Sequence, residues 1–271
     1  MDNLKIALTQ MTSIDDVETN LNQMLSLLKT LSPDQVSAVF FPENCLYMRL
    51  QEGEKIQGLS LEHESFRILS EWAKTHRTGL HLGSVPILEK DILYNGSVWI
   101  DPSGKKQVSY RKIHLFDIQL ESQKAIRESD IFKHGPQPEI LNLEDWKIGQ
   151  SICYDLRFSD LYHYYARQQV EAILIPSAFL VKTGLAHWEV LMRARAIESQ
   201  CYVIASAQAG LHKSSRGQRE TYGHSVVVDP WGQVLVELQD APDIQIVELQ
   251  KSQIQTVRKQ IPMQHHRRGP F

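Results

Sequence analysis

Three reactive side chains stand where apolar segments of this sequence end: Glu43, Lys112 and Cys153. In layered α/β proteins, ligands and reactive groups gather where strands end and loops begin. A thiol, a carboxylate and an ammonium that met at such a place could attack a carbonyl carbon and carry the acyl group as a thioester. Whether they meet depends on the elements that carry them.

Glu43 directly follows Pro42, after the apolar run from Val36 to Phe41. A single glutamate after a strand is usually an exposed loop residue. In apolar surroundings, burial raises the pKa of a carboxyl group toward neutrality, and such a group can act as a general base. Glu43 is therefore a candidate base.

Lys112 lies in the segment from Tyr110 to Asp117, beside Arg111. Two adjacent cations are usually solvated loop charges whose stems cover apolar surface. Apolar residues closely bracket Lys112, however, and favour an enclosed position. There the ammonium could donate hydrogen bonds to a developing oxyanion.

Cys153 ends a predicted strand, and a helix is expected from about Ser159. Backbone N–H groups at such a turn can stabilise a thiolate or an oxyanion, as in a nucleophile elbow, although the Gly-x-Ser-x-Gly pattern is absent. Cys45 and Cys201 are distant in sequence, and a buried inert thiol is the common fate of a single cysteine.

Histidine is the usual partner of a catalytic cysteine, and the chain has 11 histidines. His114, His187 and His224 lack a distinctive local signature for that role. A papain-like Cys–His pair therefore stays open beside the Glu43–Lys112–Cys153 arrangement. The spacing alone indicates a cysteine hydrolase without fixing its base.

The predicted elements alternate between strand and helix. Strand patterns occupy 4–8, 36–41, 81–85, 97–100, 146–153, 172–176, 202–207, 224–228, 233–238 and 245–249. Helical spacing occupies 17–28, 61–76, 161–170 and 187–200. Each half of the chain therefore has the order β-α-β-α-β-β, which predicts a layered α/β fold. No linker divides the chain, so we expect one domain over 1–271 with a tail at 263–271.

Composition narrows the class of protein. A chain of 271 residues can bury a large core, and its formal net charge of −3 gives no indication of nucleic acid or anionic membrane as a partner. The three cysteines show neither C-x-x-C nor zinc-ligand spacing, so we expect free thiols, no metal and no cofactor. The start lacks a leader pattern, and no apolar run approaches the roughly 20 residues of a membrane span. We expect a cytoplasmic protein.

Three ordered motifs carry a family resemblance. They are Pro42-Glu43, Arg111-Lys112-Ile113-His114 and Ile152-Cys153-Tyr154-Asp155-Leu156-Arg157-Phe158. With the element order, they resemble the nitrilase superfamily of carbon–nitrogen hydrolases over nearly the whole chain. The resemblance implies a four-layer α-β-β-α sandwich.

The same resemblance implies roles for individual residues. Cys153 would be the nucleophile, Glu43 the base and Lys112 an oxyanion donor. For the mechanism we expect a backbone N–H, such as that of Tyr154, as a second donor. Glu128, in Arg127-Glu128-Ser129, matches a glutamate that often supports the site in this family. Without the resemblance, Glu128 would be interpreted as a surface carboxylate.

Further segments resemble one branch, the deaminated glutathione amidases. They are Pro176 to Phe179, Thr183-Gly184, His187 to Val190, Arg193 to Glu198, Gln200 to Val203, Tyr222 to Ser225 and Asp229 to Gly232. This branch releases 2-oxoglutarate and Cys-Gly from deaminated glutathione. The neighbouring ω-amidases, which act on 2-oxoglutaramate, share several of these segments and stay an alternative. The sequence Cys153-Tyr154-Asp155 is similar to the amidases, whereas nitrilases more often have Cys-Trp-Glu.

A small amide substrate that carries carboxylates requires fixed cations. Arg157 is the first candidate, with Tyr154 beside it. The predicted loop 210–220 could close over an anionic tail or be an ordinary basic loop; its basic residues are His212, Lys213, Arg216 and Arg219. Arg193 and Arg195 are expected in structural ion pairs.

The resemblance also implies at least a homodimer. The predicted helix 187–200 is apolar on more than one side, which fits burial between layers or at an interface. The tail 263–271 could contribute to the same contact.

Three rival functions remain at this stage. A catalytically silent scaffold of the same fold is disfavoured by the intact set of reactive groups. A Cys–His acyltransferase or protease would keep most activity in a Glu43→Gln variant. An enzyme of the same fold could instead act on N-carbamoyl or nitrile substrates.

Overall fold

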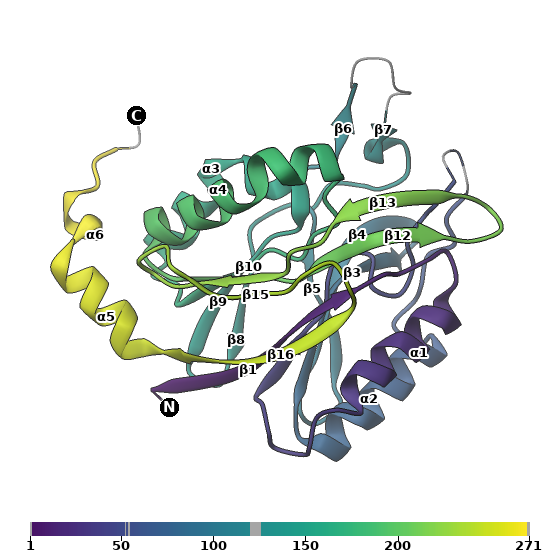
Figure 1. Ribbon diagram of the computed structural model, residues 1–271, viewed down its shortest axis with the longest axis horizontal. Helices are drawn as coiled ribbons and strands as arrows, with labels where there is room; N and C mark the ends of the chain where they lie inside the picture. Colours follow the sequence, from purple (N-terminus) through teal and green to yellow (C-terminus); the bar gives the residue numbers. More distant parts are fainter. Residues whose placement is uncertain (1, 52, 54, 120–125, 270–271) are drawn as a thin grey trace.

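The structure is a computed structural model that describes residues 2–51, 53, 55–119 and 126–269. Two large sheets lie face to face, and a pair of helices covers the outer side of each (Figure 1). The predicted four-layer α-β-β-α sandwich is thereby confirmed. None of the helices in the described residues is long and apolar enough to cross a membrane.

The first sheet has eight strands in the order β13-β12-β1-β2-β3-β4-β5, with β16 also paired to β1. Their bounds are β1 Asn3–Met11, β2 Ala38–Phe40, β3 Gly79–Glu89, β4 Ile92–Ile100, β5 Lys106–Arg111, β12 Ala207–Lys213, β13 Gln218–Tyr222 and β16 Asp243–Gln250. Strands β1, β2 and β3 are parallel, and β4 and β5 continue the sheet antiparallel.

The second sheet has six strands in the order β15-β14-β11-β10-β9-β8. Their bounds are β8 Ile140–Leu143, β9 Trp146–Gln150, β10 Ala172–Leu174, β11 Tyr202–Ala205, β14 Val226–Val228 and β15 Val234–Glu237. Strands β9, β10 and β11 are parallel and β14 is antiparallel, which repeats the pattern of β1 to β4. A short pair, β6 Asp117–Ile118 and β7 Ile126–Arg127, stands apart.

The first four helices divide between the two outer faces, and the last two follow strand β16. Their bounds are α1 Val17–Leu28, α2 Glu64–His76, α3 Ser159–Arg167, α4 Val181–Ser199, α5 Lys251–Gln260 and α6 Met263–His266, with 3-10 turns η1 Glu128–Asp130 and η2 Cys153–Arg157. Helices α1 and α2 cover the first sheet, and α3 and α4 cover the second (Figure 1). Helix α1 begins where the Asp16 side chain accepts a hydrogen bond from the N–H of Thr19.

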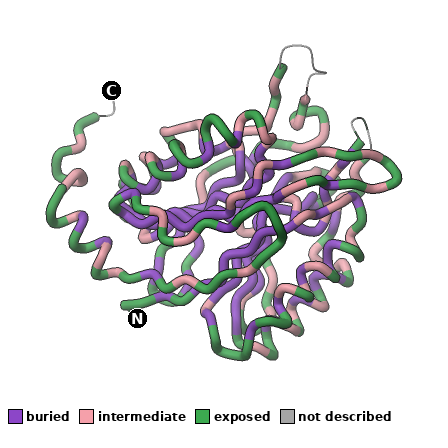
Figure 2. The backbone as a smooth tube through the Cα atoms, viewed as in Figure 1, coloured by how far each residue is buried: buried purple, intermediate pink, exposed green. Residues whose placement is uncertain are grey.

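Three apolar clusters fill the spaces between the four layers. The middle cluster joins the two sheets and includes Ile6 and Phe40 of the first and Ile148 and Ile204 of the second. Figure 2 shows the buried residues concentrated along these strands and on the inward sides of the helices. Short strands such as β2 and β10 are buried on both faces, which explains their uninterrupted apolar sequences.

Several boundaries differ from the sequence-based expectations. Helix α4 begins at Val181, six positions before His187, and its exposed face is apolar in part. The predicted loop 210–220 is largely the hairpin β12–β13, which belongs to the first sheet. These differences arise because α4 and the hairpin are held by contacts with distant segments, including the bridge between Leu180 and Thr221.

Candidate active site

The three candidate catalytic residues line one pocket at the ends of the two sheets. Glu43 follows β2 of the first sheet, Lys112 follows β5 of the same sheet, and Cys153 follows β9 of the second. Gly83 permits this meeting, because a Cβ there would lie 2.1 Å from the Phe41 carbonyl oxygen and 2.4 Å from Cβ of Pro176. The absence of a side chain thus lets the Glu43 strand and the strand beside Cys153 approach closely.

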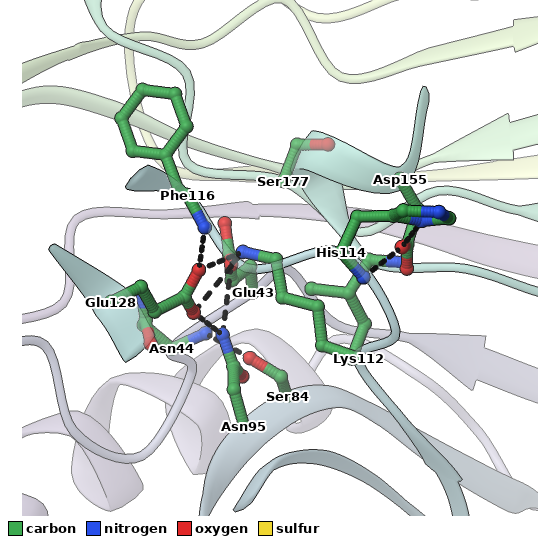
Figure 3. Close-up of polar contacts among 12 residues, drawn as sticks. Glu43, Asn44, Ser84, Asn95, Lys112, His114, Phe116, Glu128, Asp155 and Ser177 are labelled. Atoms are coloured by element: carbon green, nitrogen blue, oxygen red, sulfur yellow. Dashed lines mark hydrogen bonds and ion pairs between the residues drawn. The ribbon is translucent and has the colours of Figure 1, made fainter. Parts of the chain in front are cut away.

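Lys112 lies between two carboxylates. Its Nζ is 2.9 Å from Oε1 of Glu43 and 2.9 Å from Oε2 of Glu128, and its side chain is 2% exposed (Figure 3). Burial by itself would lower the pKa of this ammonium, but the two carboxylates outweigh it and hold the pKa well above the usual value. Lys112 is therefore cationic, and two of its three N–H bonds are directed to carboxylates.

Glu128 is fixed at the start of η1. Its Oε2 accepts a hydrogen bond from the N–H of Phe116 at 2.6 Å, and its Oε1 accepts one from Nδ2 of Asn95 at 2.7 Å. The side chain is 12% exposed. The structure thus brings Glu128 into direct contact with Lys112.

Asn95 of β4 belongs to this cluster, although sequence reasoning did not identify it. Its Nδ2 also donates to Oε1 of Glu43 at 3.1 Å, and its backbone carbonyl accepts the N–H of Lys112 at 2.9 Å. The available signal was an asparagine inside a largely apolar strand, since amides are depleted from strands and mostly exposed.

Cys153 occupies a strained turn. Its φ of 48° lies in the left-handed region, and its N–H donates to the carbonyl of Pro176 at 2.9 Å. Burial raises the pKa of the thiol well above the usual value, and the carboxylate of Glu43 raises it further through its charge and a hydrogen bond. Lys112 and the N–H of Ala178 act in the opposite direction. The thiol therefore keeps its proton at neutral pH, with Glu43 placed to receive it.

Asp155 joins the Lys112 segment to the Cys153 turn. Its Oδ2 accepts from the hydroxyl of Tyr110 at 2.8 Å and from the N–H of Ile152 at 2.9 Å. Its Oδ1 accepts from both the backbone N–H and Nδ1 of His114, at 2.9 and 2.7 Å. The His114 ring also stacks on Phe158, with centroids 3.7 Å apart. This network fixes the two motifs relative to each other.

The histidines offered no base for Cys153. His114 is turned to Asp155 (Figure 3), and no histidine occurs among the described residues that line the pocket. Within that same part of the chain, no group of three or more His, Cys, Asp or Glu side chains is arranged to hold a metal. The buried carboxylates bind the Lys112 ammonium instead.

The two predicted substrate-binding residues line the pocket. Tyr154 packs edge-on against Phe116 and Phe158, and the Arg157 guanidinium lies 5.9 Å from the Tyr154 ring centroid. Arg157 also contacts Nδ1 of His187 at 3.2 Å. Both side chains are thus held at the pocket wall by aromatic contacts.

The predicted basic loop contributes one cation to the pocket. Arg219 of β13 lines it, together with Arg49, which sequence reasoning missed. His212 is buried between Ser13 and Thr221, and burial lowers its pKa to about 4. Arg216 pairs with Asp15 at 3.0 Å. The tertiary contacts of the hairpin, and not the local sequence, decide which of these basic residues lines the pocket.

The two arginines of α4 have structural partners, as expected. Arg195 is buried, donates to the Leu156 carbonyl and pairs with Glu198 at 2.7 Å. Arg193 pairs with Glu189 at 3.1 Å on the surface. Arg195 thereby supports the turn that begins at Cys153.

The chain is similar in sequence to known proteins. The sequence model described as "Carbon-nitrogen hydrolase" matches residues 5–259. The chain is 36% identical to the nitrilase and fragile histidine triad fusion protein NitFhit of Caenorhabditis elegans, over 97% of this chain and 60% of that protein. It is also 36% identical to the deaminated glutathione amidase of Dictyostelium discoideum, over 97% of this chain and 94% of that protein.

Solved structures show the same likeness. The crystal structure of C. elegans NitFhit matches with a TM-score of 0.89 at 34% identity, covering 99% of this chain and 66% of that one. Saccharomyces cerevisiae Nit3, described as a member of branch 10 of the nitrilase superfamily, matches with a TM-score of 0.81 at 28% identity, covering 97% and 95% of the two chains.

Proposed function

This chain belongs to the carbon–nitrogen hydrolase family, and from that premise we propose that it is an amidase that hydrolyses deaminated glutathione to 2-oxoglutarate and Cys-Gly. The observation that carries the proposal is the buried Lys112 ammonium, held between Glu43 and Glu128 beside the Cys153 thiol. The name of the D. discoideum relative, which the chain covers almost completely, supports the choice of substrate.

The first half of the reaction transfers the acyl group to the enzyme. Glu43 takes the thiol proton as Sγ of Cys153 attacks the amide carbonyl carbon. The carbonyl oxygen becomes an oxyanion, and the third N–H of Lys112 and the backbone N–H of Tyr154 donate to it. When the C–N bond breaks, Glu43 returns the proton to the leaving amine, which departs as Cys-Gly. The 2-oxoglutaryl group remains as a thioester on Cys153.

The second half releases the acid. Glu43 removes a proton from a water molecule whose oxygen attacks the thioester carbon. The same donors hold the second oxyanion. The C–S bond breaks, the proton passes from Glu43 to the sulfur, and 2-oxoglutarate leaves. A positioned general base contributes about 10²–10⁴ in rate, and an oxyanion donor about 10²–10³.

The proposed substrate has one carboxylate on each side of the scissile amide, and the pocket wall is suitably cationic. Arg49, Arg157 and Arg219 all line it. The pocket encloses about 820 Å³ of space, open mouth included. Guanidinium groups suit carboxylates because their planar donors can bind both oxygens.

The runner-up substrate is 2-oxoglutaramate, which lacks the Cys-Gly end and its carboxylate. Side-by-side kcat/KM values on the two substrates decide between them, with Cys153→Ala as the blank. A hundredfold preference for deaminated glutathione, about 2.7 kcal/mol, supports the proposal. A preference for 2-oxoglutaramate makes the enzyme an ω-amidase. Turnover of neither, or only of nitriles or N-carbamoyl compounds, contradicts both.

We further propose that the chain acts as one domain in a homodimer. Leu185, Val190 and Ile197 on the outer face of α4 are 71%, 69% and 47% exposed, and the nearby Trp231 is 56% exposed. Monomeric proteins rarely expose such patches. The tail from Met263, with α6, is a candidate second part of the contact. Light scattering should give a mass of twice the chain, reduced by Val190→Glu; an unchanged mass contradicts this surface.

A cytoplasmic location belongs to the same proposal. The three cysteines are free thiols in the structure, which fits a reducing compartment. Fractionation of cells with an antibody against this protein tests the location, and recovery from an oxidising compartment would contradict it.

A further inference from the structure

Asn95 bridges the two carboxylates that hold Lys112. Its amide nitrogen donates to Oε1 of Glu43 at 3.1 Å and to Oε1 of Glu128 at 2.7 Å (Figure 3). A primary amide carries two N–H bonds, so one hydrogen serves each carboxylate. The orientation of the amide is determined by chemistry, because its oxygen could not face two carboxylate oxygens.

Just after Asn95, strand β4 pairs irregularly with both of its neighbouring strands, β3 and β5. The β3–β4 register shifts between Leu82 and Val85, opposite Gly96 and Val98, and the β4–β5 register shifts between Ser97 and Val98. Such bulges bend a strand and redirect its side chains, and they are frequent beside active sites. The bulges here accompany a side chain that reaches Glu43 and Glu128, two residues of the pocket, from the interior of a strand.

The asparagine oxygen has no partner. Asn95 is 2% exposed, and Oδ1 is a buried acceptor without a hydrogen bond among the described residues. A buried unsatisfied acceptor destabilises the folded state. A residue kept for folding alone would be expected to satisfy both of its polar atoms, whereas Asn95 satisfies only the one that faces Glu43 and Glu128.

The two nitrogen donors to Glu43 in the described part of the chain use the same oxygen. Lys112 Nζ and Asn95 Nδ2 contact Oε1, at 2.9 and 3.1 Å. An oxygen that already accepts two hydrogen bonds is a poor site for an incoming proton. The proton from Cys153, or from the hydrolytic water, is therefore directed to Oε2.

We propose that Asn95 is a positioning residue that holds Glu43 and Glu128 on either side of Lys112 and reserves Oε2 of Glu43 for proton transfer. This inference rests on the proposed role of Glu43 as the base. Three ionisable groups face Glu43 in addition to Asn95: Lys112 after β5, Glu128 of η1 and Cys153 of η2. These three groups are the same in the wild-type protein and in the Asn95 variants, so a difference between their pH profiles reports the loss of Asn95.

The decisive variant is Asn95→Ala, which removes both donors without adding a charge. A hydrogen bond to a carboxylate stabilises its charged form, and Asn95→Ala removes that stabilisation from Glu43. The base must be deprotonated, and the acid limb of the kcat/KM profile should therefore move up by about one pH unit. The plateau should fall about tenfold to a hundredfold. Asn95→Asp adds a third carboxylate and should move the limb further in the same direction.

Ser97→Ala is the matched control. Ser97 is a neighbouring buried polar residue of β4 whose hydroxyl donates to the Gly83 carbonyl at 2.7 Å. Its loss should lower the melting temperature without moving the acid limb. If Asn95→Ala also lowers only the melting temperature and leaves the limb in place, Asn95 is merely structural and the proposal is wrong.

Alkylation of Cys153 by iodoacetamide provides a readout that needs no substrate. Cys45 and Cys201 are fully buried, and mass spectrometry identifies the modified cysteine. Asn95→Ala strengthens the proton affinity of the Glu43–Cys153 pair and should move the alkylation profile to higher pH, whereas an unchanged profile opposes the proposal. A shifted profile in an enzyme that does not cleave deaminated glutathione would uphold Asn95 and refute only the substrate.

Discussion

Two buried carboxylates on either side of the Lys112–His114 segment have opposite characters. Asp155 accepts four hydrogen bonds, two on each oxygen, from Tyr110, Ile152 and His114. Glu43 accepts from two nitrogen donors, Lys112 and Asn95, both on Oε1, and it also faces the Cys153 thiol through a hydrogen bond and its charge. A carboxylate whose lone pairs are all occupied holds its neighbours in place, whereas one with an oxygen in reserve can carry a proton. The comparison separates the scaffold of the site from its chemistry.

Removing the reactive carboxylate should produce the largest loss of activity. Glu43→Gln keeps the shape and cannot accept the thiol proton, so kcat should fall by about 10²–10⁴ with little change in melting temperature. Steady-state kinetics and a thermal melt measure both. Glu62→Gln, at a side chain that is 87% exposed, is the control. Retention of most activity by Glu43→Gln would instead revive a Cys–His mechanism.

Removing the cation between the carboxylates should impair both chemistry and folding. Lys112→Met leaves Glu43 and Glu128 buried without their ion pair, which typically costs about 3–5 kcal/mol of stability. Loss of an oxyanion donor should lower kcat by a further 10²–10³, roughly. Denaturant unfolding and kinetics test this, with Lys106→Met as control at the surface pair to Glu62. An unaltered kcat in folded Lys112→Met would exclude it as a donor.

Substitution of Asp155 should reduce stability more than activity, the reverse of what we expect for Glu43. Asp155→Asn replaces one carboxylate oxygen with an NH2 group, so two of the four donors lose their acceptor, and we expect a loss of about 3 kcal/mol of stability because these buried donors are left unpaired. Activity should fall less than in Glu43→Gln, measured below the melting transition. Asp229→Asn changes another buried carboxylate, bound by Trp231 and Gln233, and should destabilise without affecting catalysis. The comparison fails if Asp155→Asn is stable but inactive.

The Cys153 thiol should report the charge of Glu43 directly. Burial and the Glu43 carboxylate raise the thiol pKa, so alkylation should be slow at neutral pH and accelerate as the pH rises. Glu43→Gln removes the negative charge, lowers the thiol pKa and should shift the rate profile to lower pH by about one unit. Burial raises the pKa of Cys45 and Cys201 to about 12, so both should stay unmodified. A shift to higher pH would contradict the assigned contact.

The smallest effect is expected at the pocket rim, away from both carboxylates. Arg49 lies between Met48 and Leu50, which are buried in a small apolar cluster, and its own side chain lines the pocket. Arg49→Ala should raise KM for deaminated glutathione about tenfold and leave kcat unchanged. A change of this size corresponds to the loss of one weak charge contact with the substrate. Arg77→Ala, at a surface pair with Asp34, is the control. An equal KM in both variants would remove Arg49 from the binding surface.

The sequence by itself determined the layers and the reactive set. Alternation in β1, helical spacing in α1 and apolar runs in β2 and β10 are local patterns, and each predicted its element. The motifs around Glu43, Lys112 and Cys153 identified the same pocket residues that the fold brings together. The β-α-β-α-β-β order of each half followed from these local signals.

Only the tertiary structure decided how the site is held. Asn95 and Asp155 gain their roles from partners 33 to 52 and 41 to 45 positions away, and no local pattern encodes those distances. The hairpin β12–β13 and the strand β16 join the first sheet through pairing with β1, which lies near the other end of the chain. Periodicity reports which face of an element is buried, but the identity of the covering residue depends on contacts between distant segments. For that reason the sequence did not predict that Arg49 lines the pocket or that His212 is buried in the core.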